Sequence, residues 1–303
     1  MYRPNGRVLL FTDSPSFFMP FFGDQPIEYI LLTSDKIRVM RGEIDFLHRM
    51  KIALLEEAFD LTDQNLLYID SDTFFINDPT PLCEVVSEKN SFMHLREYRF
   101  DSLKHLKLPA GKPFHDFLEL IEHTLFYGKD NVPISVTPYH YSWNAGAMLL
   151  HRAHRLLLGE VYRLTDQFFP RTQNHASEQY AFSIVLQNTT AIASCDSVIY
   201  HYWYRVKKQI IDAFTLERIN RSWSLSSGDQ KIKMTEQWVK MLPLFVDHHI
   251  LSLRDNAIQS FHDDKFGEGY YWAFRSFFKD PFNFQFAKDI GYHTKRQLFQ
   301  RFF

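Results

Sequence analysis

The stretch LLYIDSDTFF, residues 66–75, sets two aspartates, Asp70 and Asp72, between two runs of apolar and aromatic residues. The run before Asp70 predicts a buried β-strand, because a strand covered on both faces is apolar throughout. A turn at the end of this strand would bring both carboxylates into one site. Burying unpaired carboxylates is costly, so the pair either binds a cation or stays in water. The alternative interpretation is a polar turn that follows a strand.

The residues before this stretch predict an α/β fold. Residues 7–11, RVLLF, and the segment IEYILLTS from Ile27 are typical of buried strands. Residues 42–60 predict an amphipathic helix, because apolar residues recur every three or four positions, at Ile44, Leu47, Met50, Leu54 and Ala58. Strand, strand, helix, strand predicts an open, mixed and mainly parallel sheet flanked by helices, with ligands beyond the carboxyl ends of the strands. Asp70 lies at such an end.

The later residues extend this pattern. Residues 114–127 predict a helix within the segment 91–140, which Pro and Gly interrupt. A short buried strand is expected from Asn144, a helix over 177–188, and a strand over 196–208 that runs out into a basic turn. Beyond about residue 211 helical patterns dominate, so we expect a domain over residues 1–210 and a helical, aromatic-rich region over 211–303.

The composition excludes several classes of function. With 45% hydrophobic and 17% aromatic residues, the chain of 303 residues can bury a full core. Its 34 Lys and Arg balance 36 Asp and Glu, so there is no global positive field to attract nucleic acid. Two cysteines, Cys83 and Cys195, are too few for a disulfide framework, and no apolar run matches a signal peptide or a membrane span. We expect a cytoplasmic protein.

The aspartate pair has the chemistry of a metal site. A hard divalent cation such as Mn²⁺ or Mg²⁺ prefers oxygen ligands and also binds diphosphate oxygens. Such an ion would resolve the charge conflict between Asp70 and Asp72.

Four segments resemble a known family. LLYIDSDTFFINDP is similar to the Asp-x-Asp strand of metal-dependent GT-A glycosyltransferases, in particular the glycogenin and lipopolysaccharide-galactosyltransferase group of family 8. In the order of that family, RVLLFTDSP resembles its opening strand, YSWNAGAMLLH its Asn-x-Gly strand, and HYWYRVK its segment with a His and, six residues later, a Lys. The resemblance covers about residues 7–210. It implies a nucleotide-binding part over about 1–80 and an acceptor side over about 91–210.

The resemblance also implies roles for the matched residues. Asp70, Asp72 and His201 would hold the metal ion. The residues expected to bind the nucleotide sugar are Thr12 and Asp13 at the base, Lys207 at the diphosphate and Gly146 at the sugar. Ser71, between the two aspartates, is expected to be a further contact with the nucleotide sugar. The residues expected at the reaction centre are Asn144, Asp72 and Glu178.

Two segments depart from the family pattern. Tyr204 stands where the family usually has Gly, three residues after the His. SEQYA, with Glu178 and Gln179, stands where the family has Asp-Gln-Asp. The family likeness implies retention of anomeric configuration. Glu178 could equally be the base of an inverting reaction, a sugar contact or an ordinary carboxylate at a helix N-terminus.

The segment HRMK, residues 48–51, offers a basic contact for the nucleotide. Arg49 and Lys51 are two positions apart, about 200° around a helix, so they cannot both face one ligand. Because Arg is suited to bidentate contact with phosphate or a base, we predict that Arg49 is the ligand-binding residue.

These observations favour a metal-dependent hexosyltransferase that moves a sugar from a UDP-sugar to a glycan or lipid-linked acceptor. A haloacid-dehalogenase-type phosphatase is the first alternative, since DSDTF approaches its motif and HDDK, residues 262–265, offers a later Asp pair. A nucleotide-sugar-binding protein without catalysis is the second, and Tyr204 favours it.

Residues 270–303 hold 13 aromatic residues, with six Lys or Arg against two Asp. Basic and aromatic residues combine in this way in helices at a membrane surface. Aromatic residues also build cores, so peripheral membrane contact and a packed helical core are both open interpretations of this segment.

Overall fold

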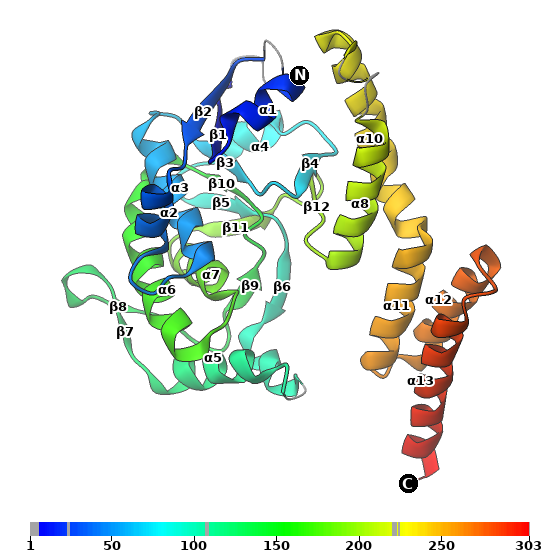
Figure 1. Cartoon of the computed structure of the whole chain (residues 1–303). Helices are drawn as coiled ribbons and strands as arrows, with labels where there is room; N and C mark the ends of the chain where they lie inside the picture. Colours follow the sequence, from blue (N-terminus) through cyan, green and yellow to red (C-terminus); the bar gives the residue numbers. More distant parts are fainter. Residues whose placement is uncertain (1–5, 23–24, 107–108, 220–222, 224, 303) are drawn as a thin grey trace. The chain divides into compact units, whose positions relative to one another are not determined.

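The computed structural model describes residues 6–22, 25–106, 109–219, 223 and 225–302 (Figure 1). The chain divides into two compact units, and the division falls between His201 and Tyr202. The sequence placed this boundary near residue 210. The first unit contains the strands and several helices, which makes it an α/β unit, whereas the described part of the second unit is helical.

The first half of the first unit alternates strands with short helices. Its elements are β1 (Val8–Thr12), α1 (Pro15–Phe22), β2 (Ile27–Leu31), α2 (Ser34–Arg41), the 3₁₀ turn η1 (Leu47–Arg49), α3 (Met50–Asp60), β3 (Leu66–Ile69), β4 (Thr73–Phe75), α4 (Thr80–Val85), β5 (Asn90–Met93) and β6 (Arg96–Arg99). The expected strands at residues 7–11, 27–34 and 65–70 are therefore confirmed.

The second half supplies the other strands and the longest helices of this unit. Its elements are η2 (Phe100–His105), α5 (Lys112–His123), β7 (Phe126–Tyr127), η3 (Lys129–Asn131), β8 (Pro133–Ile134), β9 (Tyr141–Trp143), β10 (Ala147–Leu150), η4 (Arg152–Leu157), α6 (Leu158–Thr172), α7 (Ser177–Thr189), β11 (Ala191–Ser194) and β12 (Ile199–His201).

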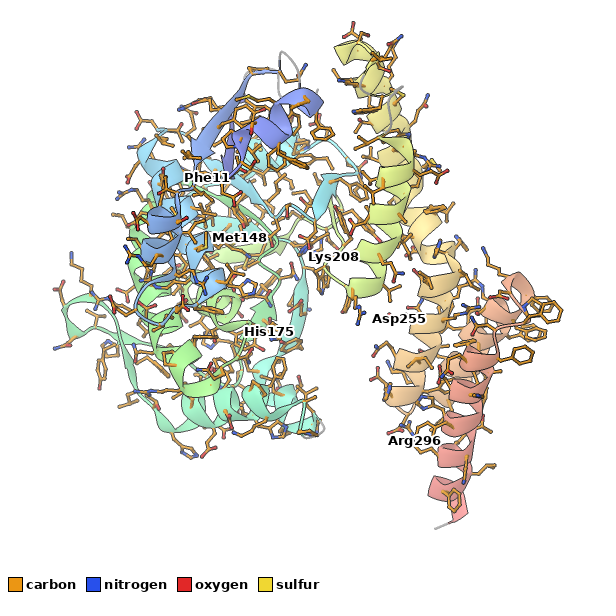
Figure 2. All side chains as sticks on the ribbon, viewed as in Figure 1. Phe11, Met148, His175, Lys208, Asp255 and Arg296 are labelled. Carbon is orange, nitrogen blue, oxygen red and sulfur yellow. The ribbon has the colours of Figure 1, made fainter. Side chains whose placement is uncertain are left out.

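A four-stranded sheet in the order β11-β5-β10-β3 lies at the centre of the first unit. Alternate residues of β10 enter two different hydrophobic clusters: Met148 and Leu150 pack in one, Ala147 and Leu149 in the other. Both faces of the strand are therefore covered, which explains why its sequence is continuously apolar. Met148 is fully buried and is labelled in Figure 2.

The strand pairs are mixed in direction. β1 pairs with β2 in parallel, and β5 with β11, whereas β10 runs antiparallel to both β3 and β5. β4 with β12 and β6 with β9 are also antiparallel. The α/β class is confirmed and the strand pairs are mixed, as expected, but no long parallel run of strands is present among the described pairs. A continuous apolar run indicates that both faces of a strand are covered and carries no information on its direction.

The helix predicted over residues 42–60 is shorter than expected. Gly42 has a positive φ of 67° and ends α2, so helical structure resumes only at η1 and α3. The sequence missed α2 itself, which begins where the Thr33 hydroxyl accepts a hydrogen bond from the backbone N–H of Lys36 at 3.2 Å.

The second unit consists of α8 (Arg205–Arg218), α10 (Gly228–His248), α11 (Ile250–His262), α12 (Phe266–Lys279) and α13 (Phe284–Phe302), together with the residues between them. The basic turn expected after Tyr204 is instead the first turn of α8. Ala257, Phe261, Ala273 and Phe286 form a small core among α11, α12 and α13. No helix in the described ranges is both long and apolar enough to cross a membrane.

Candidate metal centre

Asp70 and Asp72 lie in a turn that connects β3 to β4. The backbone N–H of Asp70 donates to the carbonyl oxygen of Gly146 at 2.8 Å, which extends the pairing of β3 with β10 by one residue. The chain then turns through Ser71, which is exposed, and the hydroxyl of Thr73 donates to the carbonyl oxygen of Asp70 at 2.7 Å. The chain therefore turns between Asp70 and Asp72, which is the condition for both carboxylates to share one site.

His201 reaches the aspartates through strand pairing. β12 runs antiparallel to β4, and His201 lies opposite Thr73 in that register, beside Asp72. One ligand atom from each of Asp70, Asp72 and His201 lies within 4.8 Å of the other two. The structure thus unites the three predicted metal ligands, and this group could bind a metal ion. His201 is buried, while both aspartates are partly exposed.

Hydrogen bonds to Asn144 fix the orientation of the His201 ring. The side-chain oxygen Oδ1 of Asn144 lies 2.9 Å from His201 Nδ1 and accepts from the backbone N–H of Gly146 at 3.0 Å. Because an amide oxygen only accepts, Nδ1 carries the hydrogen. The other ring nitrogen, Nε2, therefore presents its lone pair toward Asp72 Oδ1, 3.2 Å away. Two electron-pair donors at this spacing are the arrangement that a shared cation stabilises.

The Asn144 amide is in turn held by Glu97 on β6. Glu97 Oε1 accepts from Asn144 Nδ2 at 3.2 Å, and Glu97 Oε2 accepts from Gln179 Nε2 and from the Ser142 hydroxyl, each at 2.9 Å. Since a carboxylate only accepts, Glu97 fixes which end of the Asn144 amide faces His201. This role of Glu97 could not be predicted, because Glu97 lies in the segment 91–140, which has no clear pattern.

Two neighbours confine the imidazole of His201. A Cβ atom on Gly146 would lie 2.0 Å from His201 Cε1, so only glycine leaves room for the ring. On β5's C-terminal side, His94 is buried and packs edge-on against His201 with ring centroids 5.2 Å apart. His94 Nε2 donates to the carbonyl oxygen of Ile199 at 3.1 Å. The ring of His201 is therefore held by packing as well as by hydrogen bonds.

Lys51 of α3 neutralises part of the negative charge. Its ammonium lies 2.9 Å from Glu178 Oε1, 3.4 Å from Asp70 Oδ2 and 3.1 Å from the carbonyl oxygen of Ala145. Burial by itself would lower the pKa of Lys51, but Glu178, Tyr68 and Asp70 outweigh it, so the pKa lies above its ordinary value. Lys51 is therefore a fixed cation beside the aspartates.

Tyr68 and Glu178 complete this side of the site. The Tyr68 hydroxyl donates to Asp70 Oδ1, and burial together with the charge of Asp70 raises the pKa of the phenol even though Lys51 opposes the shift. Glu178, at the N-terminus of α7, is buried and paired with Lys51. The structure thus places the predicted Glu178 next to the aspartates through Lys51.

Arg49, which the sequence favoured as the nucleotide contact, lies outside the cluster around the aspartates. Its guanidinium binds Asp166 of α6 through two contacts of 2.7 and 3.2 Å, and it lies 4.5 Å from the centre of the Tyr162 ring. Arg49 also lines a surface pocket of about 550 Å³ with Lys36 and Glu57 among others. Of the two basic residues, only Lys51 contacts the residues around the aspartates. A contact between Arg49 and a nucleotide remains a prediction.

The other predicted contacts lie outside this cluster of linked residues. Thr12, the last residue of β1, is buried, and its hydroxyl accepts from the backbone N–H of Ser14 at 3.1 Å, while Asp13 is exposed. Lys207 lies on α8, in the second unit. The roles assigned to these three residues remain predictions.

Comparisons of the chain with protein-family models, with curated proteins and with solved structures found no match.

Proposed function

We propose that the protein is a metal-dependent glycosyltransferase that uses a nucleotide diphosphate sugar, with Mn²⁺ or Mg²⁺ held by Asp70, Asp72 and His201. The observation that carries the proposal is the convergence of these three side chains on one point from β3, β4 and β12. The donor set of two carboxylates and an imidazole is suited to Mn²⁺.

The geometry and charge of the cluster support a divalent ion. In an octahedral site with ligands at about 2.1 Å, neighbouring donor atoms are about 3 Å apart, and Asp72 Oδ1 lies 3.2 Å from His201 Nε2. Lys51 shares its one positive charge between the carboxylates of Asp70 and Glu178, which leaves an excess of negative charge on this side of the site. A divalent cation would offset most of this excess of negative charge.

The order of the sequence motifs supports a nucleotide-sugar substrate. The segments that resemble the GT-A enzymes include those that supply Asp70, Asp72, Asn144, Gly146 and His201, and these residues form one hydrogen-bonded cluster. When bound, the ion would stabilise the negative charge that develops on the departing diphosphate. Asn144 and Gly146 keep the His201 ring in place, and Lys51 holds the carboxylate of Asp70 toward the site.

The remaining assignments follow from the resemblance. Thr12 and Asp13 would contact the uracil of a UDP-sugar. Glu178 is paired with Lys51, so we assign it to positioning that ammonium rather than to proton abstraction. The sugar would then be transferred with retention of configuration to a glycan or lipid-linked acceptor.

A binding panel tests the proposal. Thermal unfolding is measured with UDP, GDP, CMP and their sugars, each with and without Mn²⁺. We expect one nucleotide to raise the melting temperature only when Mn²⁺ is present, and the Asp72→Ala variant to lose this shift. Asp35→Ala, which removes an exposed carboxylate on α2, serves as the matched control and should keep it.

Two results would count against the proposal. If no nucleotide gives a Mn²⁺-dependent shift, the donor assignment fails. Hydrolysis of a simple phosphate ester that needs Asp70 but no nucleotide would instead favour a phosphatase. The position of Asp70 after the third strand is unlike the first-strand nucleophile of the haloacid-dehalogenase superfamily.

A further inference from the structure

The helix α12 carries apolar side chains on two opposite sides. Its inner side holds the small buried residues Gly269, Ala273 and Ser276, and Gly269 lies against the ring of Phe261 on α11. Phe278 follows Gly269 by nine positions, about two and a half helical turns, and therefore points in the opposite direction. The packing of α12 on α11 thus accounts for one of its apolar sides only.

The outer side is aromatic and exposed. Tyr271, Phe274 and Phe278 follow each other at helical spacing, with Phe277 beside them. Phe282 and Phe284 continue the exposed rings into the connection to α13. We call the five phenylalanines of this surface the aromatic tip; they are Phe274, Phe277, Phe278, Phe282 and Phe284, and they are 55–79% exposed. Single exposed apolar residues are common, but five exposed rings within eleven positions, with Phe278 in ring contact with Phe274 and Phe277, mark an interaction surface.

The charges around the aromatic tip are positive. Lys279 and Lys288 are exposed, and Arg275 lies 5.2 Å from the centre of the Trp272 ring. The one acidic residue between positions 271 and 288 is Asp280, and it is paired with Arg254 at 2.6 Å. The aromatic tip therefore has three cations at its borders against one further acid, Asp289 beside Lys288, so its local charge is positive.

We propose that the aromatic tip binds the surface of an anionic lipid bilayer. Phenyl rings bury apolar area at the boundary between headgroups and acyl chains, while Lys and Arg bind lipid phosphates. A second copy of the chain fits this surface less well, because a symmetric pairing of the same surface would bring the cations of both copies together. The described helices of the chain do not cross a membrane, so the contact would be peripheral.

Vesicle flotation of the full chain tests this inference. Vesicles of phosphatidylcholine alone are compared with vesicles that also contain phosphatidylglycerol. We expect binding to the anionic vesicles that weakens as salt is added, since exposed charges are screened. The Phe278→Ser, Phe282→Ser double variant should bind at least about tenfold less, because it removes two inserted rings.

Two further variants separate the contributions. Lys279→Glu with Lys288→Glu should abolish the preference for anionic vesicles. Leu216→Ser, which alters an exposed apolar residue on α8, is the matched control and should bind like the wild type. All these positions are exposed, so the variants should keep the wild-type melting temperature.

The inference is overturned if the wild type does not float with anionic vesicles, or if the double phenylalanine variant floats equally well. It is also overturned if the wild type is a dimer that this double variant dissociates, since the rings would then bind a second copy. None of these results depends on metal or nucleotide binding, so the inference and the proposed function can fail separately.

Discussion

Replacement of Glu97 by Gln should weaken metal binding although Glu97 is not a ligand. The carboxylate accepts three side-chain hydrogen bonds, from Asn144, Ser142 and Gln179. A Gln at this position must direct its NH₂ group toward either Asn144 Nδ2 or Gln179 Nε2, and each of these nitrogens is a donor. In the first orientation Asn144 Nδ2 loses its acceptor. In the second, Gln179 Nε2 keeps the Ser142 hydroxyl as an acceptor at 2.9 Å, but that hydroxyl loses its own acceptor.

The magnitude follows from that conflict. An unsatisfied buried donor costs about 1–3 kcal/mol. Part of the conflict is relieved if the Asn144 amide rotates, but its oxygen would then leave His201 Nδ1 and the backbone N–H of Gly146. Residues that orient a metal ligand typically contribute about 10–100-fold to metal affinity. We expect a weakening of this size in the Mn²⁺ dissociation constant, measured by isothermal titration calorimetry.

A second substitution should restore binding. In the Glu97→Gln, Gln179→Glu double variant, the amide at 97 accepts from Asn144 and donates to the carboxylate at 179, which still accepts from the backbone N–H of Ala145. The net charge is unchanged and every donor has an acceptor. We expect the Mn²⁺ dissociation constant of the double variant to lie within about threefold of the wild-type value.

The control separates metal binding from general stability. Ser183 accepts from the backbone N–H of Trp143 at 2.9 Å and donates to the carbonyl oxygen of Gln179 at 2.7 Å, so Ser183→Ala disturbs the same contact between β9 and α7. It should lower the melting temperature and leave Mn²⁺ affinity unchanged. The reasoning is refuted if Glu97→Gln binds Mn²⁺ like the wild type, or if the double variant binds no better than Glu97→Gln.

Three further predictions follow from the structure. Gly146→Ala should lower Mn²⁺ affinity at least about tenfold, because the added Cβ displaces the His201 ring. An unchanged Mn²⁺ dissociation constant in titration calorimetry would contradict the packing of Gly146 against His201. Lys51→Met should reduce the free energy of unfolding, measured by urea unfolding, by about 3–5 kcal/mol, since Glu178 is left buried and uncompensated. The double variant Lys51→Met, Glu178→Met should recover most of this lost free energy. Burial lowers the pKa of His154, so below about pH 6.5 the unfolded state takes up a proton that the folded state resists, and the free energy of unfolding falls as the pH decreases. In the His154→Gln variant, the melting temperature should depend less on pH between about pH 7 and about pH 5. An unchanged pH dependence would exclude His154 as its cause.

The sequence predicted the metal ligands better than their surroundings. Asp70 and Asp72 follow a strand whose apolar run is unmistakable, and His201 stands between another short strand and a basic segment. Their convergence could be predicted because both aspartates and the histidine lie at strand ends. Glu97 and His94 lie in a segment without periodicity, and their roles arise only when β5, β6 and β9 bring distant residues together.

The choice between Arg49 and Lys51 shows a different limit. Helical geometry excludes that both face one ligand, but it does not say which one does. The answer depends on Asp166, on a helix more than a hundred positions later, which binds the Arg49 guanidinium. The direction of β10 is a similar case, because coverage on both faces gives the same apolar run in parallel and antiparallel strands.

The central claim is that one divalent cation binds between Asp70, Asp72 and His201. The most direct measurement is the anomalous scattering of crystals grown with Mn²⁺ and UDP. We expect one strong anomalous peak about 2.0–2.3 Å from an oxygen of each aspartate and from His201 Nε2. Diphosphate oxygens of UDP should occupy further coordination positions of the same ion. A well-ordered site without such a peak, or Mn²⁺ bound at other residues while these three contact only one another, would contradict it.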